Sequence, residues 1–307
     1  MSVFFYFCGN TFYMIVVFGS DGFLGNRMVA KLQASGNVQG FNRGGMDTEE
    51  NSSFRDTAVF SFTEKDAFFR FLPEHYREVK WVVYCDKRIP NTTLSVFRRE
   101  FVQKLWTVAA TYALPLLYAF HQPMESPVSD FQPDTFVQWA GKQFRKPPFW
   151  YIFRVGEVYG QGEESFGERI SRVNLFYRQI AETGEANLPN PEREEEGADA
   201  TRDYLYVQDA VRVFYWFMLH RPADGVYDLG SGFARTDIAV VNAIFRALKL
   251  PPRIRYSDFS ANMPDEMKSC FLPDLRNLRG VGYRKPFFSV EKGVKSSLRT
   301  FKKTEKF

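Results

Sequence analysis

The chain has 307 residues, of which 45% are hydrophobic and 25% charged, and its net charge is +4. This length suits one large domain, or one domain with a smaller appendage, and the composition is that of an ordinary globular protein. So mild a positive charge does not by itself indicate nucleic-acid binding. The 33 phenylalanines predict a core rich in aromatic side chains.

The cysteines Cys8, Cys85 and Cys270 lie far apart and form no C-x-x-C pair. We therefore expect no metal site, no disulfide framework and a reducing compartment. No apolar run approaches the roughly 18 residues needed to span a bilayer, so we also expect no transmembrane segment. The basic end of the chain, 299–306, is interpreted as a solvated tail rather than a binding arm.

The first 13 residues carry no Lys or Arg, so they match neither a signal peptide nor an Arg-rich transit peptide. Met14 stands where a first strand would start, and we treat 1–13 as an N-terminal extension. The favoured interpretations are an extra packed segment or an over-long gene model. The alternative is an exposed aromatic surface that binds a partner.

Strand-like and helix-like segments alternate along the first half of the chain. Met14 to Phe18 is a continuous apolar run that ends at a glycine, as buried parallel strands do. Further strands are predicted at 38–41, 58–62, 81–84, 114–120 and 150–155, and helices at 26–34, 67–76 and 97–112. This alternation predicts an α/β protein with a Rossmann-type doubly wound parallel sheet.

After Gly160 the alternation loosens. Helices are predicted at 166–183, 237–248 and 290–302, a strand at 253–256, and a loop at 189–201 whose acidic run is interpreted as a solvated tip. We expect a dinucleotide-binding Rossmann domain over 14–165, completed by about 202–235. The segments 166–201 and 236–307 would then form a small C-terminal α/β substrate domain.

The segment between the first strand and the first helix has the spacing G-x-x-G-x-x-G. Its glycines would allow a tight turn and a close approach of the backbone to a pyrophosphate, whose charge would meet the helix N-terminus. The position after a buried strand makes this glycine pattern informative. The predicted cofactor-binding residues here are Gly19, Ser20, Asp21, Gly22, Phe23, Leu24 and Gly25.

The end of the second predicted strand bears on the choice of cofactor. An Asp or Glu there would hold the ribose hydroxyls of NAD, but this chain has Asn42 and Arg43. The missing carboxylate removes repulsion against a 2′-phosphate, and an arginine can pair with that phosphate. We therefore expect NADP rather than NAD, with a plain surface role for Arg43 as the alternative.

Four ordered motifs resemble those of the NAD(P)-dependent epimerase/dehydratase family, which are extended short-chain dehydrogenases/reductases. They are Val16 to Gly25, Phe153 to Gly160 (FRVGEVYG), Arg202 to Asp209 (RDYLYVQD) and Val226 to Gly232. The closing stretch Asp274 to Phe287 most resembles the ADP-glyceromanno-heptose 6-epimerase branch. The resemblance implies a Tyr that exchanges a proton with a sugar, a Lys four residues later, and a Ser or Thr near the end of the fifth strand.

This chain departs from that pattern. Aligning Lys142 with the family's Lys places Gln138 at the Tyr position, and a Gln amide cannot exchange a proton at neutral pH. His121 falls near the Ser position, where it could serve as a substitute base with Lys142 tuning it. No Tyr lies between Tyr118 and Tyr151, so a shift of register does not restore the motif.

We therefore expect a catalytically degenerate member that binds NADP (or NAD) without turnover, as an accessory subunit of a larger assembly. Its partners would be other protein subunits or a ribonucleoprotein, and its compartment the mitochondrial matrix, otherwise the cytoplasm. The alternatives are an active NADP-dependent nucleotide-sugar epimerase or dehydratase, and an NADP(H)-sensing regulatory subunit. If a sugar substrate is bound, Arg202 would contact its phosphate; otherwise Arg202 would pair with Asp203 or Asp228.

Overall fold

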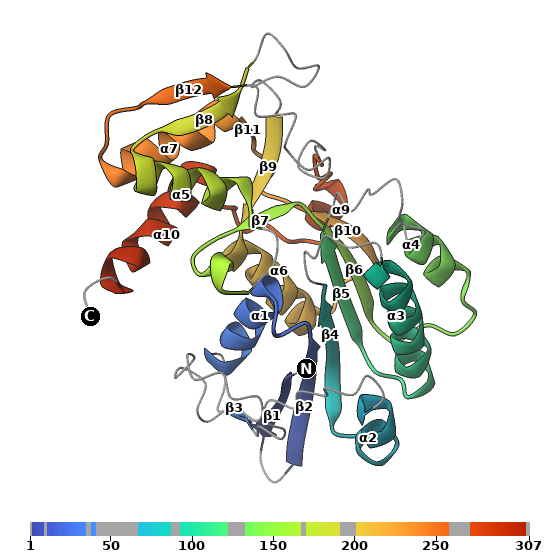
Figure 1. The fold of residues 1–307 in the computed structure, drawn as a ribbon. Coiled ribbons are helices and arrows are strands. Elements are labelled where there is room, and N and C mark those ends of the chain that lie inside the picture. Colours follow the sequence, from blue (N-terminus) through green and yellow to red (C-terminus); the bar gives the residue numbers. More distant parts are fainter. Residues whose placement is uncertain are drawn as a thin grey trace.

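The computed structural model describes residues 2–8, 11–34, 38–40, 67–86, 93–121, 133–166, 170–190, 201–257 and 271–304. Seven strands form a central sheet in the order β10-β6-β5-β4-β2-β1-β3 (Figure 1). Their bounds are β1 Ser2–Cys8, β2 Thr11–Phe18, β3 Val38–Gly40, β4 Val79–Cys85, β5 Leu116–His121, β6 Trp150–Val155 and β10 Gly225–Leu229.

Five neighbouring strands of this sheet, from β10 to β2, are parallel. Strand β1 runs antiparallel between β2 and β3 and pairs with both of them. The first strand of the parallel set therefore begins at Thr11 rather than at Met14, and residues 2–8 form a strand of their own. The strand thus starts three residues before the position expected from the sequence, and β1 is an additional strand beside it.

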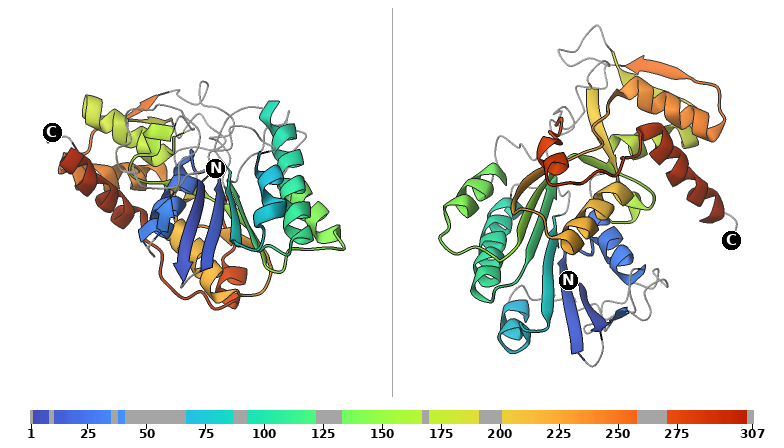
Figure 2. Two further views of the ribbon diagram at one scale, coloured as in Figure 1. Left: turned by 90° about the horizontal axis from the view of Figure 1, so that it is seen from below. Right: turned by 180° about the vertical axis from the view of Figure 1, so that it is seen from behind.

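Helices cover both faces of the sheet, because successive strand residues point to opposite sides. On one face Val17, Val83 and Leu117 pack with the helices α1 and α6 in one hydrophobic core. On the other face Val16 and Val82 join a second core. The helices are α1 Phe23–Ala34, α2 Ala67–His75, α3 Thr93–Thr111, α4 Pro133–Lys142 and α6 Val207–His220; in Figures 1 and 2, α1 and α6 lie on one side and α2, α3 and α4 on the other.

A smaller lobe lies beyond the carboxyl ends of the parallel strands (Figure 1). It holds a three-stranded sheet in the order β11-β9-β7 and a parallel pair, β12 and β8. Its elements are β7 Glu157–Tyr159, the 3-10 helix η2 Glu163–Phe166, α5 Arg172–Thr183, β8 Ala186–Pro189, β9 Thr201–Tyr206, β11 Ala234–Thr236, α7 Asp237–Leu248, β12 Ile254–Ser257, α9 Arg276–Gly280 and α10 Val290–Thr304.

The fold class predicted from the sequence, a Rossmann-type α/β sheet with helices on both faces, is confirmed. The strand 150–155 and the helix 237–248 have the predicted bounds. The predicted helix 166–183 begins later, at Arg172, where Ser171 caps it through a hydrogen bond from the Asn174 N–H. The predicted strand 58–62 and the acidic run 192–196 lie outside the described residues.

The helices of the described chain include none that is both long and apolar enough to cross a membrane.

Because β1 is paired on both sides, its backbone N–H groups should exchange slowly with solvent. We expect hydrogen exchange followed by mass spectrometry to show protection of 4–6 comparable to that of β4. Exchange of 4–6 at the rate of an unstructured peptide, with β4 still protected, would contradict the placement of β1 inside the sheet.

Candidate functional site

The glycine-rich turn joins β2 to α1 at the carboxyl edge of the sheet. Gly19 has φ +73°, and a Cβ on it would collide with the backbone carbonyl oxygen of Cys85 in β4. A Cβ on Gly25 would collide with the carbonyl oxygen of Gly19. Both positions therefore require glycine, one for its conformation and both for the close packing of the turn.

The turn leads directly into a helix, as a pyrophosphate site requires. The Gly22 N–H donates to the Gly19 oxygen at 3.0 Å, and α1 starts at the next residue. Phe23 and Leu24 are buried beneath the turn, whereas Asp21 is exposed. The first N–H groups of a helix have no acceptors within it, so the start of α1 suits a phosphate. These residues fit the dinucleotide that the sequence predicts.

A second segment passes over the start of α1. Gly160 packs so closely on Val207 and on the ring of Phe23 that a Cβ there would lie 2.7 Å from Val207 Cγ1. The Arg27 guanidinium donates to the Gln161 carbonyl oxygen at 2.5 Å. The FRVGEVYG motif therefore ends in a glycine that is needed for packing against the glycine-rich turn.

The predicted selectors of NADP follow β3. Asn42 and Arg43 themselves lie outside the described residues. Because β1 separates β3 from β2, the end of β3 lies two strand spacings, or about 10 Å, from the strand that carries the glycine-rich turn.

The residues expected at the proton-transfer site are not brought together. His121 is the last residue of β5 and is 93% buried at the carboxyl edge of the sheet. Gln138 and Lys142 lie on α4 and are exposed to solvent.

The packing of α4 shows which part of the sheet it covers. Phe136 lies against Tyr118 in the middle of β5, with 5.5 Å between ring centroids. Trp139 contacts Trp106, whose ring also lies 5.3 Å from that of Trp150, the first residue of β6. Phe136 also lies 6.1 Å from Trp106, so α4 packs on both α3 and β5 through these rings. Lys142, in the last turn of α4, is exposed to solvent.

A buried ion cluster joins three elements of the small lobe, α5, β9 and α7. Asp237, at the start of α7, accepts hydrogen bonds from Arg172 at two atoms and from the Tyr204 hydroxyl at 2.6 Å. Arg202 lies 3.6 Å from the same carboxylate. All four residues are at least 94% buried. The sequence did not suggest this cluster, because its members lie on α5, β9 and α7.

The cluster is held in defined protonation states. Burial lowers the pKa of Arg172, but the charge and hydrogen bond of Asp237, together with Tyr204 and Glu157, raise it by more in sum, so the guanidinium stays charged. Burial and the charge of Asp237 raise the pKa of Tyr204 well above its usual value. Tyr204 is therefore a neutral hydroxyl donor and not a proton-transfer group.

Asp203 and Asp228, offered by the sequence as partners of Arg202, bind other groups. Asp203 accepts from the backbone N–H groups of Ser231 and Gly232 at 2.6 and 2.7 Å. Burial raises the pKa of Asp203, and these hydrogen bonds oppose that rise. Asp228 accepts from Arg154 at 2.6 Å and from the Asp274 N–H at 3.2 Å.

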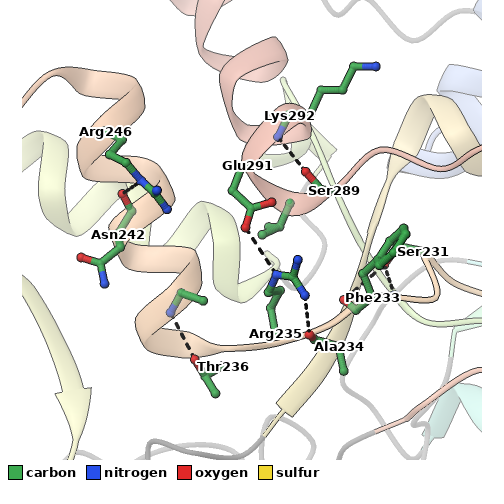
Figure 3. Close-up of polar contacts among 12 residues, drawn as sticks. Ser231, Phe233, Ala234, Arg235, Thr236, Asn242, Arg246, Ser289, Glu291 and Lys292 are labelled. Carbon is green, nitrogen blue, oxygen red and sulfur yellow. Dashed lines mark hydrogen bonds and ion pairs between the residues drawn. The ribbon is translucent and has the colours of Figure 1, made fainter.

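Two further carboxylates, those of Glu157 and Glu291, bind neighbouring segments within the small lobe. Glu157, the first residue of β7, accepts from the Arg172 N–H at 2.5 Å at the start of α5. Glu291, at the start of α10, binds Arg235 of β11 at 3.3 Å, as Figure 3 shows. Both contacts place a carboxylate at the N-terminal end of a helix, where the helix dipole favours negative charge.

Among the described residues, no group of three or more His, Cys, Asp or Glu side chains is arranged to hold a metal ion.

No protein-family model matches the chain. The ADP-L-glycero-D-manno-heptose-6-epimerase of Fusobacterium nucleatum is 28% identical over 173 residues, which cover 54% of this chain and 52% of that protein. The enzyme of the same name from Alkalilimnicola ehrlichii is 25% identical over 313 residues, covering 93% of this chain and 96% of its own length.

Solved structures agree in fold along almost the whole chain. The Helicobacter pylori ADP-L-glycero-D-manno-heptose-6-epimerase has a TM-score of 0.69 at 14% identity, and covers 94% of this chain and 96% of its own. The UDP-glucose 4-epimerase of Thermus thermophilus in complex with NAD has a TM-score of 0.64 at 17% identity, with coverages of 94% and 98%.

The chain has the Rossmann-type fold of extended short-chain dehydrogenases/reductases, and it is similar to proteins of the NAD(P)-dependent epimerase/dehydratase type. The fold and the matches confirm the family resemblance that the sequence motifs indicated. Within that family the curated matches carry the name ADP-L-glycero-D-manno-heptose-6-epimerase, in agreement with the resemblance of the stretch 274–287.

Substitution of Gly19 should disrupt the glycine-rich turn. We expect Gly19→Ala to lower the free energy of unfolding by more than about 2 kcal/mol, because its φ is positive and the new Cβ meets backbone. Gly141→Ala is the matched control: nothing lies within 4 Å of its Cβ position in α4. It should leave stability unchanged or raise it by up to about 1 kcal/mol. Urea denaturation measures both, and equal effects would rule out this account of the turn.

Removal of the charge on Asp237 should destabilise the lobe. We expect Asp237→Asn to cost about 3–5 kcal/mol, because it leaves the buried Arg172 and Arg202 guanidinium groups without a counter-charge. Arg178→Gln, which removes an exposed ion pair with Glu182, should cost less than about 1 kcal/mol. Thermal denaturation of the two variants side by side tests the difference; a loss below about 1 kcal/mol for Asp237→Asn would refute a stabilising role for the cluster.

Proposed function

We propose that this chain is a catalytically degenerate epimerase/dehydratase-like protein that binds NADP, or NAD, without turnover. It serves as a structural accessory subunit of a larger assembly. The observation that carries the proposal is that Gln138, which stands in the place of the family's Tyr, and Lys142 are exposed on α4, whereas His121 is buried at the end of β5.

Proton transfer to or from a sugar needs its groups within hydrogen-bond reach of one another, directly or through one water. His121 is buried at the end of β5 and Lys142 is exposed in the last turn of α4, so Lys142 is badly placed to tune His121 as a substitute base. Gln138, exposed on α4, has no exchangeable proton at neutral pH. This arrangement favours loss of turnover over a rebuilt active site.

The surroundings of Arg202, the residue expected to contact a substrate phosphate, also support the proposal. Arg202 is buried, and its guanidinium lies beside the carboxylate of Asp237. An arginine whose charge is already balanced by the protein gains little from an added phosphate. We therefore infer that Arg202 stabilises the lobe rather than binding a nucleotide sugar.

The glycine-rich turn, by contrast, keeps what a dinucleotide needs, and solved relatives hold NAD. We infer that NADP is preferred. Asn42 and Arg43 stand in the sequence where an Asp or Glu would hold the ribose of NAD; without that carboxylate a 2′-phosphate is not repelled, and an arginine can pair with it.

The proposed partners are other protein subunits, in the mitochondrial matrix or, failing that, the cytoplasm. The abundance of phenylalanine and the basic end of the chain suit such contacts. Fractionation of cell extracts by compartment and by native size tests this part. We expect the chain in the mitochondrial fraction at a mass well above its own 35.7 kDa. A free monomer or dimer in the cytosol would argue against it.

Turnover and binding are tested separately on the purified protein. Isothermal titration should detect NADP, and Arg43→Asp should weaken NADP more than NAD. With NADP and either ADP-heptose or UDP-glucose, we expect no epimer or dehydrated product, while the Alkalilimnicola relative serves as a positive control with its own sugar.

Product that appears with the wild-type chain, and disappears in His121→Ala or Lys142→Ala, would overturn the proposal in favour of an active enzyme. Absence of any dinucleotide binding would overturn the cofactor part alone. A large difference in affinity between the oxidised and reduced cofactor would point instead to an NADP(H) sensor.

A further inference from the structure

The connection from α4 to β6 places a basic, aromatic surface at the amino edge of the sheet. The ring of Phe144 is fully exposed, at 101% of its reference area. The neighbouring cations are exposed as well. The surface consists of Lys142, Phe144, Arg145, Lys146, Phe149 and Arg221.

Residues from two connections meet there. The Arg221 guanidinium, at the end of α6, lies 5.0 Å from the ring of Phe149. The Lys146 ammonium lies 5.6 Å from the ring of Trp150. These contacts agree with the pairing of β6 with β10, whose amino ends bring 143–149 and 221–224 together. The surface is therefore continuous over both connections.

The charge of this surface is predominantly positive. Within 135–150 and 219–225 the sequence has four Lys or Arg and one acidic residue, Asp224. Asp224 accepts a hydrogen bond from the Trp150 N–H at 3.0 Å, so it has a role in the fold. A net positive surface attracts a polyanion.

The exposed ring of Phe144 favours a nucleic acid over an acidic peptide or an anionic membrane as the partner of this surface. Phe144 offers a π-face to a base, and stacking of this kind tolerates any sequence. An acidic peptide would pair with the cations but leave the ring in water. A membrane needs more exposed apolar surface than one ring, because Phe149 and Trp150 are already covered by Arg221 and Lys146.

We propose that the surface formed by Lys142, Phe144, Arg145, Lys146, Phe149 and Arg221 binds single-stranded RNA, with a base on Phe144 and phosphates on the cations. The two prolines that follow Lys146 restrict the backbone there and reduce the entropy lost on binding. The surface lies at the edge opposite the glycine-rich turn. It is independent of whether a dinucleotide is bound.

The test uses the full chain and a 12-nucleotide, mixed-sequence RNA carrying a fluorophore, with anisotropy as the readout at low and moderate salt. Phe144→Ser should weaken binding about 5-fold to 100-fold through lost stacking. Arg145→Glu with Lys146→Glu should weaken it at least 10-fold and flatten its salt dependence. All three positions are exposed, so circular dichroism and melting temperature should not change.

Matched controls lie elsewhere on the surface. Phe233→Ser removes a half-exposed ring, and Arg253→Glu reverses an exposed charge on the small lobe; both should bind RNA as the wild type does. Equal weakening by control and test variants would overturn the proposal, as would no binding at low salt. Tighter binding to phosphatidylserine vesicles or to a poly-glutamate peptide than to RNA would overturn it in favour of a membrane or an acidic protein.

Discussion

A carboxylate buried away from water must find hydrogen-bond donors, because an unpaired one costs several kcal/mol. Four aspartates at the carboxyl edge of this sheet satisfy that constraint by binding segments distant in sequence. Asp203 holds the turn after β10, Asp209 accepts from the Phe288 N–H at 2.6 Å, Asp228 holds the segment before α9, and Asp237 binds Arg172. The first three contacts attach the small lobe to β10 and α6, and the fourth joins α5 to α7 within the lobe.

These contacts show a structural role for residues in two of the family-like motifs. The aspartates of RDYLYVQD, Asp203 and Asp209, each bind backbone N–H groups. Gly230, in the following motif, packs so closely on Asp203 that a Cβ would lie 2.8 Å from its carboxyl carbon. Such residues are needed for folding whether or not the protein catalyses a reaction. Their presence alongside a dispersed proton-transfer set is therefore consistent with the proposed accessory role.

The two edges of the sheet differ in chemistry for a topological reason. In a parallel sheet with helical crossovers, one edge collects the turns that enter helices and the other collects the turns that enter strands. The first carries the glycine-rich turn and the start of α1, which favour a phosphate. The second carries the exposed ring of Phe144 and its cations. The proposed dinucleotide and RNA would bind without competing for space.

Local pattern was enough to predict the sheet, its helices and the glycine-rich turn, because strand and helix periodicity and the glycine spacing are properties of adjacent residues. Sequence comparison also identified Gln138 as a departure from the family. It could not show how α4 packs on α3 and β5, nor that β1 separates β2 from β3. The ion pair between Arg202 and Asp237 could not be predicted from the sequence either. The two residues are 35 positions apart, so their contact depends on how β9 packs against α7. Residue type alone allows several acidic partners for Arg202.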